Sequence, residues 1–230
     1  MARLVGFFLL VLLTLSLLRS LPGVGRWLGG FWGFWLVAIA LGAGLSGLMG
    51  VLTRQRRLSG ELRQLAEVDS PHNQGKLGSM LLAHGRAGRA VPYLQAAAGG
   101  EPEVAEWHYR LGGALLETGR AAEALGPLES AAVLDPEHAY GGVQLALARA
   151  RQASGDAEGA LAALETFDRN EGASPESCYR RGLALRRLGR RDEARTSFAR
   201  VGQLAGRAAR FQRAQNRPWV WRALLRRLVA

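Results

Sequence analysis

Residues 42 to 47, GAGLSG, have the G-x-G-x-x-G spacing with which many oxidoreductases bind the pyrophosphate of a dinucleotide. That chemistry requires the glycines to close a strand and open a helix, because free N–H groups at the helix N-terminus bind the phosphate. Here the glycines lie inside an uncharged run from Phe31 to Leu52. No strand or turn signal precedes them, and a membrane helix would use every backbone donor internally. The surroundings therefore argue against a dinucleotide site.

Other residues capable of catalysis or metal binding are scattered. The four histidines form no H-x-x-H or H-E-x-x-H group, and the single cysteine, Cys178, rules out an internal disulfide and a thiolate zinc set. No local pattern brings serine, histidine and acid together. We expect no catalytic residue, no metal site and no cofactor, and hence a protein that is not an enzyme. The histidines are His72, His84, His108 and His138.

The region around this motif has a different interpretation when its residues are taken at intervals of four. Ala38, Gly42, Ser46 and Gly50 form a stripe of small residues along one face of a helix. Such a stripe allows close packing of membrane helices, where lipid provides no hydrophobic drive for association. Its partner would be the other membrane helix or a second copy of the chain, which would make a homodimer. A Gly- and Ala-rich composition producing this spacing by chance is the alternative.

Two apolar segments near the N-terminus predict a transmembrane hairpin over residues 1–52. Residues 31–52 are long enough, at about 1.5 Å per residue, to cross the hydrocarbon core of a bilayer. Residues 4–18 form a shorter uncharged run, and we expect an uncleaved helix over about 4–21 with a turn near Pro22. A signal-peptide core is the alternative for this first run, although no small-residue cleavage site follows it.

The distribution of arginine predicts the orientation of this anchor. The segment between the two spans carries Arg19 and Arg26, whereas Arg54, Arg56, Arg57 and Arg63 follow the second span. Because the more basic flank stays in the cytoplasm, we expect a protein of the bacterial inner membrane with a cytoplasmic soluble domain. Cleavage of the first segment would leave this orientation unchanged.

The net charge of +11 is distributed unevenly along the chain. Residues 1–57 carry six arginines and no acid, and residues 58–176 carry 17 acids against nine bases. Residues 177–230 carry 15 arginines against two acids. This asymmetry indicates that the basic ends meet an anionic surface, or that the tail meets the acidic middle of the chain.

From Lys76 onward the sequence repeats itself. The segment KLGSMLLAHGRAGRAVPYLQAAAGGEP is followed by RLGGALLETGRAAEALGPLESAAVLDP at a period of 34, and two further copies follow. Between the second and third copies the step is 36, so the region YGGVQL contains about two extra residues. In each copy small residues stand where two antiparallel helices would cross, and a glycine would end the first helix. These glycines are Gly85, Gly119, Gly155 and Gly189.

The period and residue pattern resemble the tetratricopeptide repeat family over residues 70–202. The resemblance implies an all-α fold in which about four helix pairs stack into a right-handed solenoid with a concave groove. We expect residues 53–69 to link it to the membrane hairpin. Small residues at the crossings favour the same arrangement independently of the family.

By the layout of that family, first-helix residues line the groove. The resemblance implies a scaffold that binds a protein or peptide, and the residues suit an extended segment with acidic and apolar side chains. The Lys and Asn set with which some members bind a C-terminal carboxylate is absent. The expected groove residues are Tyr109, Arg110, Leu116, Arg149, Gln152, Tyr179, Arg180, Leu183 and Arg186.

The last 37 residues contain no acid and are rich in arginine. We expect a capping helix over residues 203–217, stopped by Pro218, and a basic amphipathic tail over 218–230. The tail either lies on an anionic membrane surface or docks on the acidic body of the solenoid. Nucleic acid is a third alternative, for which the tail lacks any recognised reading motif. The expected membrane-surface residues are Trp219, Trp221, Arg222, Arg226 and Arg227.

The sequence thus predicts a membrane-anchored scaffold. Its expected partners are an acidic protein or peptide and the lipid bilayer. One alternative is a solenoid outside the cytoplasm, similar to the anchored repeat proteins of cytochrome c maturation. Another is a membrane-tethered nucleic-acid binder that uses the basic tail. The short inter-helix segment and the charge bias favour the cytoplasmic scaffold.

Overall fold

The computed structural model describes residues 42–44, 46–47, 49–50 and 69–229, and it divides into two compact units, Met1–Gln64 and Leu65–Ala230. In the first unit the described residues are helical, and the Ser46 hydroxyl donates to the Ala43 carbonyl over 2.9 Å. Every regular element within the described ranges is a helix. The predicted all-α class is confirmed for this part of the chain.

The two predicted spans lie largely outside the described residues. Within 42–44, 46–47, 49–50 and 69–229, no helix is both long and apolar enough to cross a bilayer. A Cβ atom added at Gly42 or Gly50 would meet no heavy atom within 4 Å in the described structure. The anchor and the small-residue stripe stay predictions.

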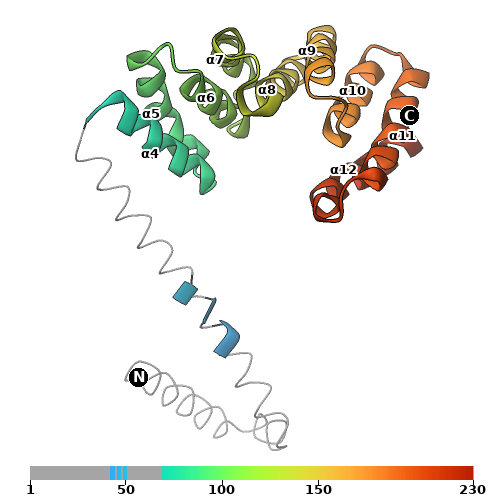
Figure 1. Ribbon diagram of the computed structural model, residues 1–230, viewed down its shortest axis with the longest axis horizontal. Helices are drawn as coiled ribbons and strands as arrows, with labels where there is room; N and C mark the ends of the chain where they lie inside the picture. Colours follow the sequence, from blue (N-terminus) through green and yellow to red (C-terminus); the bar gives the residue numbers. More distant parts are fainter. Residues whose placement is uncertain (1–41, 45, 48, 51–68, 230) are drawn as a thin grey trace, which may run out of the picture. The chain divides into compact units, whose positions relative to one another are not determined.

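The second unit consists of helix pairs followed by a final helix (Figure 1). The four pairs confirm the predicted repeat number. Their bounds are α4 (Pro71–Ala83) with α5 (Ala87–Gly100), α6 (Ala105–Glu117) with α7 (Ala121–Leu134), α8 (His138–Ser154) with α9 (Ala157–Asn170), and α10 (Pro175–Arg187) with α11 (Arg191–Arg207). Helix α12 (Arg210–Val229) follows.

Local sequence signals set the ends of the first helices. Ser174 and Ser177 form a reciprocal capping box at the start of α10, where Pro175 occupies the first turn and needs no N–H partner. The glycine predicted at the end of each first helix has a positive φ, such as +70° at Gly85 and +97° at Gly155. This left-handed conformation turns the chain back toward the second helix.

Within each pair, small residues bring the two helices close together. A Cβ atom at Gly78 would lie 2.6 Å from Leu94 Cγ, and one at Gly182 would lie 2.5 Å from Phe198 Cε1. The alanines facing these crossings, such as Ala90 and Ala194, are fully buried. The predicted close crossings are therefore confirmed, and they bury the large side chains of the second helix.

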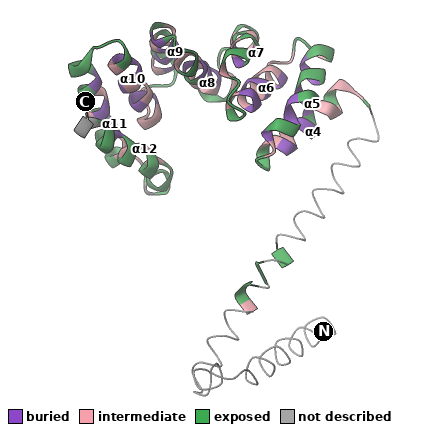
Figure 2. Cartoon of the chain, turned by 180° about the vertical axis from the view of Figure 1, so that it is seen from behind, coloured by how far each residue is buried: buried purple, intermediate pink, exposed green. Residues whose placement is uncertain are grey.

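The first helices lie next to one another along the solenoid. Helix α6 contacts both α4 and α8, and α8 contacts α10, whereas each second helix contacts only first helices and, for α11, the final helix α12. Buried residues recur in every pair instead of gathering in one centre (Figure 2). The first helices therefore form one continuous surface, and each pair depends on its neighbours for burial.

The third pair begins irregularly, where the sequence indicates about two extra residues. Ala139 and Tyr140 have φ values of +56° and +52°, and Gly141 has +69°, so the regular part of α8 begins after them. Left-handed backbone costs non-glycine residues free energy. The insertion is thus absorbed as a turn between α7 and α8.

The end of the solenoid differs from the predicted boundaries. Helix α11 runs to Arg207, and the break falls at Ala208, whose ψ is 148°. Helix α12 then continues through Pro218, where the sequence predicts the end of a capping helix. A proline removes one backbone hydrogen bond, to the carbonyl four residues earlier, and here that residue, Ala214, is exposed to water. The segments 203–217 and 218–230 are therefore not separate helices.

We predict that Gly182→Ala destabilises the solenoid by about 1–3 kcal/mol, because the new methyl group overlaps buried Phe198. Gly202→Ala in α11 is the matched control: it has open space around its Cβ position and should stabilise the helix by up to about 1 kcal/mol. Urea unfolding measures both. Equal stability of the two variants would contradict the crossing geometry.

Candidate functional site

The candidate binding surface runs across the first helices at one repeating position. Ser79, Gly113, Arg149 and Leu183 each follow the small residue that packs against the second helix. All four are exposed or half-buried. A Cβ atom at Gly113 would lie 3.9 Å from Leu82 of the preceding first helix, which places this position on the shared surface of α4 and α6. We call these four residues the central row.

The predicted groove residues differ in exposure. Arg149 is exposed, Tyr179 is buried, and the remaining seven are half-buried. Tyr179 is 8% exposed because its ring packs against Phe198 and Trp219, at centroid distances of 5.8 and 5.6 Å. It is a core residue here, covered by α12, and not part of an open groove.

Arg110 and Arg180 occupy equivalent positions in α6 and α10, and each pairs with a glutamate one turn earlier. Arg110 Nε lies 2.6 Å from Glu106 Oε1, and Arg180 Nη2 lies 2.6 Å from Glu176 Oε1. Burial lowers the pKa of Arg180, and the charge of Glu176 opposes this shift. With its side chain only 14% exposed, Arg180 is committed to an internal ion pair.

Arg149 differs from both of these arginines. One turn earlier, α8 has Leu145 where a glutamate partner would be needed, and no carboxylate within the described ranges forms an ion pair with Arg149. The charge of Arg149 also contributes to lowering the pKa of Arg180, so the two guanidinium groups lie near each other. Among the described residues, Arg149 is therefore an exposed cation of the central row without a carboxylate counter-ion.

Gln152 is used for packing between repeats. Its Nε2 donates to the backbone carbonyl of Arg180 over 2.6 Å, and its own backbone carbonyl accepts from Arg187 Nη1 over 2.7 Å. These bonds join the C-terminal half of α8 to α10. Gln152 thus helps to set the spacing of the two helices, and one of its side-chain N–H groups is used inside the solenoid.

Sequence reasoning missed a polar cluster between α6 and the turn before α8. His138 Nε2 lies 2.7 Å from Glu106 Oε2, its Nδ1 lies 3.3 Å from Asp135 Oδ2, and its ring meets that of Tyr109 edge-on. Burial raises the pKa of Glu106, but hydrogen bonds and charges from Arg110 and His138 outweigh it and lower the pKa overall. Glu106 and His138 are 32 residues apart, so no local pattern indicated them.

The described residues contain no His, Cys, Asp and Glu group that could hold a metal ion. Cys178 is buried, and burial is the main cause that raises its thiol pKa. A raised pKa opposes formation of the nucleophilic thiolate. The cysteine is therefore unsuited to covalent catalysis.

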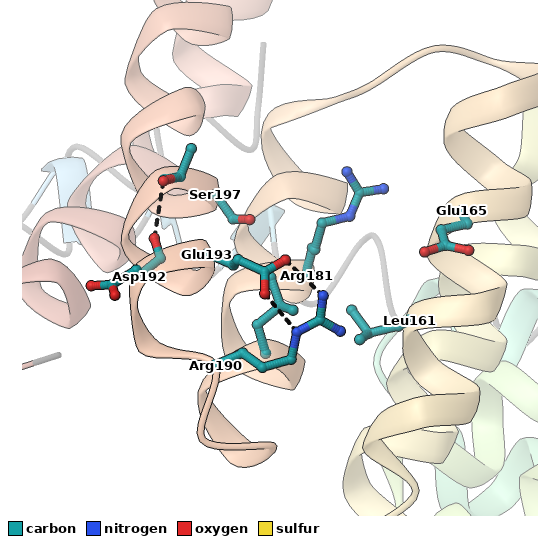
Figure 3. A pocket seen from close by; sticks show the side chains of 9 residues that line it. Leu161, Glu165, Arg181, Arg190, Asp192, Glu193 and Ser197 are labelled. Carbon is teal, nitrogen blue, oxygen red and sulfur yellow. Dashed lines mark hydrogen bonds and ion pairs between the residues drawn. The ribbon is translucent and has the colours of Figure 1, made fainter.

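A pocket of about 460 Å³ lies between α9, α10 and α11, near Arg181 and Arg190 (Figure 3). Both cations are already paired: Arg181 with Asp168 over 2.5 Å, and Arg190 with Glu193 over 2.6 Å. The Arg190–Glu193 pair repeats Arg120–Glu123, which stands at the same place in the second repeat. It is therefore a feature of the repeat and does not indicate a ligand site.

Two segments of the chain match models of the tetratricopeptide repeat, residues 76–139 and residues 176–205. These two segments are similar to tetratricopeptide repeats. The first match covers most of α4, with α5, α6 and α7, and the second covers most of α10 and of α11. Between them lie most of α8 and all of α9. A comparison with curated proteins found no match.

Solved structures share this tetratricopeptide repeat fold. MamA from Desulfovibrio magneticus RS-1, residues 41 to its end, is 20% identical and superposes with a TM-score of 0.59, covering 69% of this chain and 92% of that one. A thermophilic TPR protein from Thermus thermophilus is 21% identical with a TM-score of 0.56, covering 79% of this chain and 96% of that one. At these identities the likeness shows the fold.

We predict that Glu106→Gln removes a pH-dependent part of the stability. Because the folded-state pKa of Glu106 lies below its ordinary 4.5, its contribution is present above pH 4.5 and is lost as the pH falls through the lower value. Near neutral pH the free energy of unfolding of the wild type should exceed that of the variant by up to about 1 kcal/mol. The difference is no larger because the Glu106 side chain is partly exposed. The difference should shrink in acid. Identical urea midpoints for the two proteins from about pH 3 to pH 7 would contradict this.

Proposed function

We propose that the tetratricopeptide repeats form a non-catalytic module that binds an extended, acidic segment of a partner protein across α6, α8 and α10. The continuous surface of first helices supports the proposal, because it offers one uninterrupted path across neighbouring repeats. The partner segment crosses the central row at Arg149. Catalysis has no part in this function.

The exposed guanidinium of Arg149 carries the proposal. Its equivalents are Gly113 and Leu183, so the middle repeat places one positive charge between two uncharged positions. A carboxylate of the ligand would supply the counter-ion that the described part of the chain lacks there, in a charge-assisted hydrogen bond. The ligand segment therefore carries an acidic residue opposite α8.

Half-buried apolar side chains on α6, α8 and α10 would contact the rest of the segment. Leu145 lies one turn before Arg149 on α8, Leu116 lies on α6 and Leu183 on α10, and all three are half-buried. Each has apolar surface left to bury against a ligand. An acidic residue flanked by apolar residues at alternating positions fits this surface, as in other modes of extended-peptide recognition.

We predict that Arg149→Glu weakens binding of acidic peptides by about tenfold or more, because attraction becomes repulsion at the centre of the surface. The probe is a library of extended peptides that vary in acidic and apolar content, measured with the wild type and the variant. Stability should change by less than about 0.5 kcal/mol, since the side chain is exposed.

Arg169→Glu is the matched control, because this exposed arginine near the end of α9 undergoes the same change of charge outside the first helices. The control should bind like the wild type. If both variants lose binding equally, net charge and not the central row determines recognition, and the assignment fails.

We further propose that residues 1–52 anchor this module in the bacterial inner membrane with the repeats in the cytoplasm. The uncharged run of residues 31–52 and the arginines that follow it support this topology. A homodimer through the stripe containing Gly42 and Gly50 is part of the same proposal.

A pair of reporter fusions tests the topology. A reporter that is active only in the cytoplasm should be active after Ala230 and silent when inserted near Gly25, because the more basic flank stays inside. The reverse pattern would favour a module outside the cytoplasm. Activity at both positions would contradict the hairpin.

A further inference from the structure

Helix α12 docks on the solenoid with one face only. Ala223 is 3% exposed within the cluster formed by α10 and α11, and Trp219 and Val220 pack against that cluster. The guanidinium carbons of Arg180 and Arg222 lie 5.3 and 5.0 Å from the centre of the Trp219 ring. Trp219, which the sequence places on a membrane surface, is half-buried here against Tyr179 and the two arginines.

The opposite face of α12 is apolar and exposed. Phe211, Ala214, Pro218, Trp221 and Leu225 follow one another at intervals of three and four residues, so they share one side of the helix. We call these five residues the apolar stripe. Phe211, Trp221 and Leu225 are 77, 67 and 64% exposed. The stripe extends over about four helical turns, and large exposed apolar patches of this kind mark interaction sites.

Arginines flank the apolar stripe on both sides. At about 100° per residue, Arg213 and Arg217 fall on one edge, and Arg222 and Arg226 fall on the other. All four are exposed. No acidic residue occurs after Glu193 in the sequence, so no charge on α12 neutralises them.

A pocket of about 380 Å³ opens beside one of these edges. It is lined by Tyr179, Arg222, Leu225 and Arg226, which places two guanidinium groups next to the apolar stripe. An anion at the level of these arginines would lie beside an apolar chain that contacts Leu225. Phospholipids have this combination of a charged phosphate and an adjoining hydrocarbon.

We propose that the apolar stripe of α12 inserts into the surface of an anionic bilayer, with the four flanking arginines on lipid phosphates. Long arginine stems can lie along the apolar surface while the guanidinium groups stay at the headgroups. A second copy fits less well, because stripe-to-stripe contact would bring two positively charged edges together. The acidic middle of the same chain is not the occupant, because α12 already meets the solenoid through its other face.

This contact goes beyond the proposed function and is independent of the central row. It uses the outward face of the final helix, whereas a protein ligand would use α6, α8 and α10. A single repeat module would thus contact lipid and protein at once. Membrane composition would then influence where the module is held, whether or not residues 1–52 anchor it.

The test is a fluorescence measurement on the full-length chain carrying Leu225→Cys with an environment-sensitive label. Buried Cys178 should not compete for the label, because its thiol is inaccessible and its pKa is raised. The label should shift to the blue on vesicles that contain phosphatidylglycerol, and it should not shift on neutral phosphatidylcholine vesicles. High salt should reverse the shift, because the arginines act through screened charges.

Two kinds of control test whether the fluorescence shift arises at the apolar stripe: a label at another site, and charge-reversal variants. Val133 on α7 is 83% exposed and lies away from α12, so a label on Val133→Cys should not shift. Arg226→Glu should weaken the response at position 225 by about tenfold, whereas Arg191→Glu, an equal charge change at the start of α11, should not. Arg149→Glu should also leave the shift unchanged, which separates this test from that of the groove.

Three results would each overturn the proposal. A blue shift that grows with protein concentration without lipid would mean that a second copy covers the stripe. An equal shift on neutral and anionic vesicles would remove the role of the arginines. No shift on either vesicle, with an acidic helical peptide producing one instead, would assign the stripe to a protein partner.

Discussion

The close crossing of two helices within each repeat is the constraint on which the remaining structure depends. At Gly78, Gly112 and Gly182 a side chain would overlap leucine or phenylalanine from the paired helix. Only a hydrogen atom fits there, so the backbones approach and the large side chains become fully buried. A single pair still exposes apolar surface, and stacking on the next pair buries it. The shared surface of first helices is a consequence of this stacking.

Charges on that surface follow a simple division between paired and unpaired arginines. Arg110 and Arg180 have a glutamate one turn earlier, and these ion pairs are internal to one helix. Arg149 has Leu145 in that place and stays exposed to a ligand. Because the helices are held at fixed spacing, partly by the bond from Gln152 to Arg180, the exposed cation has a fixed position relative to its apolar neighbours. A rigid, preorganised surface loses less entropy on binding.

Helix α12 shows how one amphipathic segment can serve two contacts. Docking and membrane binding exclude each other only if such a segment has a single apolar face. Here Trp219 and Ala223 dock, while Trp221 and Leu225 are exposed on the side away from the solenoid. Pro218 does not interrupt the helix, so both faces persist along its length. Capping of the last repeat therefore leaves an apolar stripe available to a further partner.

The sequence by itself determined the repeats: their number, the glycine turns after the first helices and the small residues at each crossing. These features are local or strictly periodic, and the backbone conformations and volumes they impose recur at a spacing of 34 to 36 residues. Only the tertiary structure decided which candidate side chains stay available. Tyr179 and Trp219 pack against each other, and Glu106 pairs with His138 across 32 residues. Such outcomes depend on how separate helices pack, and sequence spacing carries no direct measure of that packing.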